Sequence, residues 1–131
     1  MPTMSDPVPS SRILIVEDDA IIRMVAADIL ATEGYDVEEA EDAAAALRVL
    51  EARSDVRLLF TDINMPGDMD GLDLARAVHE RWPDIVLVLT SGRAVLLSSE
   101  IPDDGRFVPK PYTAARLVSQ VQAAIASHPL C

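Results

Sequence analysis

Short apolar runs alternate along this chain with longer segments in which apolar residues recur every three or four positions. Most of the runs are continuously apolar, which is typical of strands buried on both faces. Residues 35–39 alternate instead, as a half-exposed strand near a sheet edge does. Pro109 has no N–H for a neighbouring strand, so the last run also belongs at an edge. The predicted strands are residues 12–16, 35–39, 56–61, 85–89 and 106–109.

Helical periodicity follows four of these runs. The first predicted helix ends at Gly34, the second begins after the capping residue Asp42, the third covers residues 72–82 before Pro83, and the last begins after Thr113. The 3.6-residue period predicts the inward-facing residues. They are Ile21, Ile22, Val25, Ile29 and Leu30 in the first helix, Ala43, Leu47 and Leu50 in the second, Leu74, Ala75, Val78 and Trp82 in the third, and Leu117, Val118, Val121 and Ile125 in the last.

Strands that alternate with helices give a parallel sheet covered on both faces. Right-handed crossovers leave few orders, and the common one for five strands is 2-1-3-4-5. We therefore predict an α/β, flavodoxin-like doubly wound sheet in one domain, residues 12–127. Residues 94–100 leave room for about two helical turns before Pro102, so the fourth helix is expected to be short or irregular. Residues 1–11 are expected to be a disordered lead-in, and 128–131 a tail.

Polar residues stand at the carboxyl ends of the predicted strands, where sheets of this kind bind ligands. They are Glu17, Asp18 and Asp19 after the first strand, Asp62 after the third, Thr90 and Ser91 after the fourth, and Lys110 after the last. Two carboxylates about 4 Å apart repel by about 4 kcal/mol at an effective dielectric near 20, so three of them need more counter-charge than one lysine supplies. Mg²⁺ fits, because it prefers oxygen ligands and keeps waters for a phosphate. The set predicts phosphoryl transfer, with the metal and the lysine holding the phosphoryl oxygens and Asp62 as the nucleophile.

Taken together, the strand-end motifs resemble the receiver domain of two-component response regulators, of the stand-alone type. The resemblance covers about residues 12–127, and as an ordered set the motifs are highly specific. The motifs are Val16-Glu17-Asp18-Asp19, Thr61-Asp62-Ile63-Asn64-Met65-Pro66, Met69-Asp70-Gly71, Leu89-Thr90-Ser91 and Val108-Pro109-Lys110-Pro111-Tyr112. One departure is the loop from Gly67 to Gly71, which has one residue more than the usual pattern.

The resemblance implies a role for each acidic residue. Asp62 is the implied phosphoacceptor, and Asp18 and Asp62 are the implied Mg²⁺ ligands. Glu17 is implied to act through a water, and Asn64 through its backbone carbonyl. Asp19 we expect to cap the first helix instead.

The resemblance also implies roles at the other two strands. Thr90 is the implied ligand of a phosphoryl oxygen, and Lys110 is the implied ion-pair partner of the phosphoryl group. Phe107 matches the aromatic switch residue of the family, although ordinary packing explains it about as well. The Lys110–Pro111 peptide bond is usually cis in the family.

Composition limits the partners. The formal net charge of −11 argues against nucleic-acid binding. No apolar run reaches the roughly 18 residues of a membrane span, and no signal peptide is recognisable. A single cysteine, Cys131, indicates a reducing compartment, so we expect a cytoplasmic protein.

The expected phosphodonor is a sensor histidine kinase or a histidine phosphotransfer protein. No output domain follows in the sequence, so signalling is expected through an unknown protein partner. A phosphate sink and a pseudo-receiver that acts only as an interaction module are alternatives, although a pseudo-receiver normally lacks an acid or the lysine.

Two enzyme-like alternatives are weaker. An aspartate-nucleophile phosphatase needs a second Asp two residues after the first, where this chain has Asn64, so turnover of external substrates is not expected. Dinucleotide binding needs a glycine-rich turn after the first strand, where Glu17 and Asp18 stand.

Overall fold

The computed structural model describes residues 12–92 and 105–127. Within them, strands and helices alternate in the predicted order, with boundaries shifted by one or two residues. The elements are β1 (Arg12–Val16), α1 (Ala20–Thr32), β2 (Asp36–Ala40), α2 (Ala43–Ala52), β3 (Val56–Asp62), α3 (Gly71–Arg81), β4 (Val86–Ser91), β5 (Arg106–Pro109) and α4 (Ala114–Ser127). The predictions for the lead-in, for the short fourth helix and for the C-terminal tail lie outside the described residues, and the label α4 belongs to the last predicted helix.

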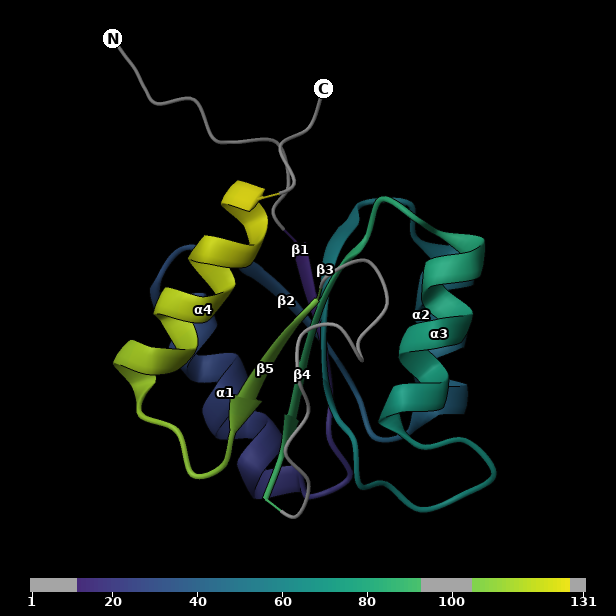
Figure 1. Cartoon of the computed structure of the whole chain (residues 1–131), viewed down its shortest axis with the longest axis horizontal. Helices are drawn as coiled ribbons and strands as arrows, with labels where there is room; N and C mark the ends of the chain where they lie inside the picture. The colour runs from purple at the N-terminus through teal and green to yellow at the C-terminus, as the bar shows by residue number, and fades with distance from the viewer. Residues whose placement is uncertain (1–11, 93–104, 128–131) are drawn as a thin grey trace, which may run out of the picture.

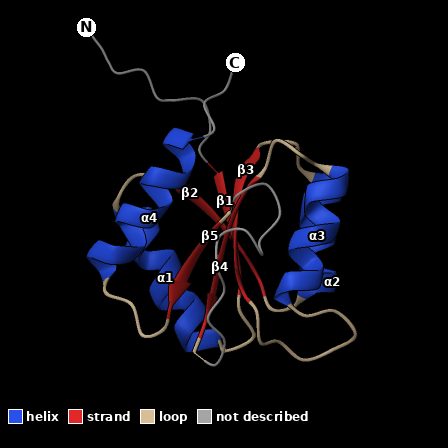
Figure 2. Cartoon of the chain, in the orientation of Figure 1, coloured by secondary structure: helices blue, strands red, loops and turns tan. Residues whose placement is uncertain are grey.

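The five strands form one parallel sheet in the order β2-β1-β3-β4-β5, as predicted. Helices α1 and α4 cover one face, and α2 and α3 cover the other (Figure 1). Figure 2 shows the resulting three layers, with the strands between two pairs of helices. The edge strands are β2 and β5, in agreement with the alternation of β2 and with Pro109 in β5.

Alternate residues of the central strands supply the two cores. Leu14, Leu59 and Leu87 face α2 and α3, whereas Ile15, Phe60 and Val88 face α1 and α4. All six side chains are at most 3 % exposed. Because β1, β3 and β4 are packed on both faces, their carboxyl ends are held firmly, and the residues that follow them have fixed positions.

Helix α1 turns only the later part of its predicted side inward: Leu30 is buried and Ile29 packs partly against the core, as predicted, but the first turns do not. Ile21 is 70 % exposed, Val25 51 % and Ile22 37 %, and the residues that α1 buries are Ala26, Ala27 and Leu30. The reason is that α1 starts directly after the loop at the carboxyl edge, so its first turns lie beside a pocket, which Ile22 lines, and only the later turns pack on the sheet. The prediction was wrong for Ile21, Ile22 and Val25, which are left on the surface.

Candidate functional site

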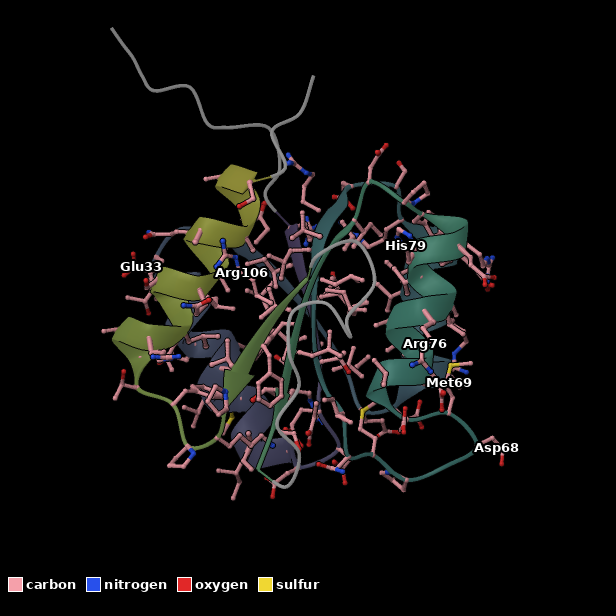
Figure 3. All side chains as sticks on the ribbon, viewed as in Figure 1. Glu33, Asp68, Met69, Arg76, His79 and Arg106 are labelled. Carbon is pink, nitrogen blue, oxygen red and sulfur yellow. The ribbon has the colours of Figure 1, made fainter. Side chains whose placement is uncertain are left out.

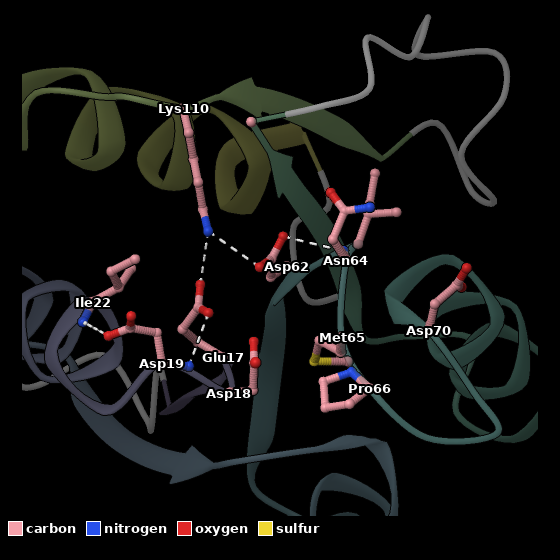
Figure 4. Close-up of a pocket in the computed structure, with 12 residues that line it drawn as sticks. Glu17, Asp18, Asp19, Ile22, Asp62, Asn64, Met65, Pro66, Asp70 and Lys110 are labelled. Carbon is pink, nitrogen blue, oxygen red and sulfur yellow. Dashed lines mark hydrogen bonds and ion pairs between the residues drawn. The ribbon is translucent and has the colours of Figure 1, made fainter.

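The carboxyl ends of the strands surround a pocket of about 630 Å³ (Figure 4). The loop after β1, the end of β3 with its following loop, and the residue after β5 all contribute to it. Its lining residues are Glu17, Asp18, Asp19, Ile22, Asp62, Ile63, Asn64, Met65, Pro66, Asp70, Gly92 and Lys110. The fold therefore brings together five of the predicted site residues: Glu17, Asp18, Asp62, Asn64 and Lys110.

Three carboxylates form the centre of this pocket. One oxygen atom each from Glu17, Asp18 and Asp62 lies within 4.8 Å of the others. Glu17 and Asp62 are each only 5 % exposed, whereas Asp18 faces solvent. Three oxygen donors at this separation, with an opening to water, fit a small hard cation that retains some of its own waters, such as Mg²⁺.

Lys110 reaches across the pocket to two of the three carboxylates. Its Nζ donates to Glu17 Oε1 at 2.9 Å and to Asp62 Oδ2 at 3.1 Å. Burial alone would lower the pKa of Lys110, but its hydrogen bonds to Glu17 and Asp62 outweigh that effect and raise it. Burial raises the pKa of Glu17, and the nearby Asp62 carboxylate adds to this, although Lys110 and the Asp19 N–H oppose it. The Lys110 side chain therefore stays positively charged, and the raised pKa of Glu17 means that this carboxyl group keeps its proton to a higher pH than an exposed glutamate does.

The loop that carries Glu17 and Asp18 is held from several directions. The Asp19 side chain caps α1 by accepting from the N–H groups of Ile21 and Ile22 at 2.9 and 3.0 Å, as predicted. From α1, Arg23 donates to the Glu17 carbonyl at 2.8 Å and to Glu39 of β2 at 3.1 Å. The pattern of polar residues at strand ends does not indicate Arg23. The signal for it in the sequence is a single basic residue one turn into a helix that follows three acids.

The end of β3 is held by close backbone contacts. The Gly71 N–H donates to the Ile63 carbonyl at 2.9 Å, and a Cβ on Gly71 would lie 2.0 Å from the Asp62 carbonyl oxygen. Only glycine allows α3 to start this close to the reactive residue. The Asn64 N–H donates to Asp62 Oδ1 at 3.2 Å, so the two Asp62 oxygens have different partners, Asn64 and Lys110.

Thr90, the implied ligand of a phosphoryl oxygen, and Phe107, the implied switch residue, are not among the described residues that line the pocket. Thr90 is 2 % exposed, and its hydroxyl donates to the Val108 carbonyl of β5 at 2.6 Å. Phe107 is half-buried against the core under α2 and α3. The Lys110–Pro111 peptide bond is cis, as the resemblance implied.

One further hydrogen bond at the pocket rim was not predicted. The Ser91 hydroxyl donates to the Asn64 side-chain oxygen at 2.5 Å. Nothing in the spacing of the two residues, which are 27 positions apart, indicates this contact.

A doubly wound sheet binds its ligand at the carboxyl edge, and there this chain has a buried strand-end aspartate, two further acids and a lysine. The family model of the response regulator receiver domain matches residues 13–122. This chain belongs to that family. No helix among residues 12–92 and 105–127 has the length and hydropathy needed to cross a membrane.

Named relatives agree with this assignment. The chain is 36 % identical over 114 residues to the response regulator receiver protein CpdR of Brucella abortus, with 85 % of this chain and 93 % of that protein covered. It is 33 % identical over 117 residues to the sensor kinase CckA of Brucella abortus, with 86 % of this chain covered but only 12 % of that protein's length. Among solved structures, the CheY-like receiver domain protein of Methanospirillum hungatei has a TM-score of 0.81 at 30 % identity, with 91 % and 96 % of the two chains covered.

Proposed function

We propose that this chain is a Mg²⁺-dependent phosphoacceptor receiver, which takes a phosphoryl group onto Asp62 from a histidine kinase or a histidine phosphotransfer protein. The observation that carries the proposal is the placement of the Asp62 carboxylate in the pocket, 3.1 Å from Lys110 and beside Glu17 and Asp18. The sequence has all the acids and the lysine of the family pattern, which argues against a pseudo-receiver. A relative whose name is sensor kinase, CckA, supports a kinase as the donor class.

The proposed transfer needs few groups. An Asp62 oxygen attacks the phosphorus of a phosphohistidine, the phosphorus–nitrogen bond breaks, and its electron pair stays on the imidazole. Lys110 holds a phosphoryl oxygen in place of part of its present contact with Asp62. Mg²⁺, when bound by Glu17, Asp18, Asp62 and the Asn64 carbonyl, supplies further positive charge toward the phosphoryl oxygens.

Readout of the modification is proposed to begin at Thr90. The Thr90 hydroxyl would donate to a phosphoryl oxygen instead of the Val108 carbonyl. This would remove one hydrogen bond between β4 and β5, next to Phe107. The downstream protein partner would then recognise this edge of the sheet. We propose that the protein works in the cytoplasm, because kinase donors use ATP. We also propose that it does not turn over external substrates.

Incubation with Mg²⁺ and radiolabelled acetyl phosphate tests the proposal. The wild-type chain should be labelled, the label should be lost when EDTA is present, and Asp62→Asn should not be labelled. Asp68→Asn is the matched control, because Asp68 lies at the tip of the loop before α3, away from the pocket (Figure 3), and it should be labelled as the wild type is. Labelling of the Asp62→Asn variant would contradict the proposal.

A further inference from the structure

Ser91 and Asn64 join two strand ends across the rim of the pocket. Ser91 is 1 % exposed at the end of β4, whereas Asn64 is exposed and lines the pocket. The backbone fixes their separation, because Asp62 pairs with Thr90 in the sheet and the Ile63 N–H donates to the Thr90 carbonyl at 2.9 Å. The 2.5 Å hydrogen bond from the Ser91 hydroxyl therefore anchors the exposed Asn64 carboxamide to a buried residue of the sheet, whose position is fixed.

We propose that Ser91 is a positioning residue that prolongs the life of the phosphoryl group on Asp62, by withholding the Asn64 side-chain oxygen from the water that would hydrolyse it. This inference rests on the proposed function, since it concerns the loss of the same phosphoryl group. In the loss reaction, a water oxygen attacks phosphorus and the bond from phosphorus to the Asp62 oxygen breaks. Its electron pair stays on the Asp62 carboxylate, and both protons of the water leave with the phosphate as dihydrogen phosphate.

The attacking water needs an acceptor that holds its protons while its lone pair points at phosphorus. Most acceptors around the pocket have other partners: Glu17 binds Lys110 and the Asp19 N–H, Asp19 caps α1, and Asp70 caps α3. Asp18 is the exposed member of the carboxylate cluster and fits the cation.

Among the described residues that line this pocket, Asn64 is the one with an uncharged side-chain oxygen, and it lies two residues after Asp62. While Ser91 donates to that oxygen, the bond occupies one of its two lone pairs and holds the oxygen toward β4. The N–H₂ group at the other end of the carboxamide can only donate to a water, and it cannot accept the proton that the attacking water gives up. Without the Ser91 donor, the Asn64 side-chain oxygen can turn toward the attacking water and accept a hydrogen bond from it.

The test is the decay of the phosphorylated protein after excess acetyl phosphate is removed, with Mg²⁺ held constant. Ser91→Ala should lose its phosphoryl group about three to ten times faster than the wild type, which is the rate equivalent of one ordinary hydrogen bond. Ser91→Cys, with a thiol that is a weaker donor of similar size, should lie between the two. Thermal unfolding of both variants reports whether the buried position tolerates the change.

A double-mutant cycle separates this role from a general loosening of β4. In an Asn64→Ala background, Ser91→Ala should no longer change the decay rate, because the oxygen that it releases is absent. Equal decay of Ser91→Ala and wild type overturns the inference alone, and so does acceleration that persists in the Asn64→Ala background. A wild-type chain that takes no label at all would overturn the proposed function as well.

Discussion

Gly71 shows how strictly one residue can limit the geometry of the site. The helix α3 begins against the backbone of Asp62, and the space between them does not admit a methyl group. The capping box of Asp70 and Asp73 fixes the start of the helix, so α3 cannot simply slide away. Part of the precision with which Asp62 is presented therefore comes from a residue with no side chain.

We expect Gly71→Ala to destabilise the fold by about 1–3 kcal/mol and to slow labelling of Asp62, because the new methyl group must displace the end of β3. Gly92→Ala is the matched control, since its added Cβ would lie 3.7 Å from Lys110 Cβ, which is ordinary contact. Its unfolding free energy should stay within about 0.5 kcal/mol of the wild type. Urea unfolding of the two variants checks this, and equal stabilities would contradict the account.

Sequence reasoning identified the charged residues of the site because each of them directly follows a strand, and strand ends are readable from apolar runs. It placed Asp19 as a cap and Asp18 in the carboxylate cluster correctly. It could not find the bond from Ser91 to Asn64, because that contact depends on the path of the loop after β3. Residue types do not determine this path.

Among the elements, α1 differs most from expectation. The 3.6-residue period correctly groups Ile21 and Val25, but it does not say which side of a helix meets the sheet. Small residues decide this here, because Ala26 and Ala27 allow α1 to lie close to the strands and leave the larger side chains outside. Ile21 and Val25 line an apolar groove of about 520 Å³, together with Ile22, Lys110 and Tyr112. This groove adjoins the acidic pocket, because Ile22 and Lys110 line both.

We expect this groove to contact the protein that brings a phosphohistidine to Asp62, because a donor that reaches the pocket must pass over its rim. Val25→Ser should slow transfer from any phosphorylated kinase or phosphotransfer protein that labels the wild type by about tenfold, the cost of one apolar interface anchor. Labelling by acetyl phosphate should not change. Ala115→Ser, an exposed position on α4, is the control. Equal loss with both donors would mean that the variant damages the site instead.

At the scale of the whole molecule, the two ends of the sheet have different tasks. The carboxyl end of the sheet forms the acidic pocket. At the amino end, two arginines make ion pairs that connect neighbouring strands. Asp55 before β3 accepts from Arg12 of β1 at 2.8 Å and from Arg53 at the end of α2 at 3.1 Å, and both arginines also pair with Glu38 of β2. Three strands and a helix meet in this network.

The network predicts a pH dependence of stability. Hydrogen bonds from Arg53 and then Arg12 hold the pKa of Asp55 well below its usual value of 3.8. The stability that Asp55 contributes is therefore fully present above that value and is lost as the pH falls toward the folded-state pKa. Asp55→Asn should lower the midpoint of thermal unfolding at neutral pH, and the difference from the wild type should shrink below about pH 4. A difference that is constant with pH would contradict this.

The strand order and the presence of helices on both faces of the sheet followed from the sequence, because alternation of short apolar runs with helical periods leaves few topologies. Boundaries shifted by one or two residues, since β4 continues to Ser91 beyond its apolar run. Hydrogen bonding within the sheet extends past the hydrophobic signal at this edge, and Thr90 and Ser91 become part of the strand that supports the site.

The most direct test of the account is to identify the residue that is modified. After reaction with acetyl phosphate and Mg²⁺, borohydride reduction converts an aspartyl phosphate to homoserine, which peptide mass spectrometry locates. We predict conversion at Asp62, dependent on Mg²⁺, with Asp18 and Asp19 unchanged. Conversion at another acid, or none at Asp62 in folded protein supplied with Mg²⁺, would contradict the central claim.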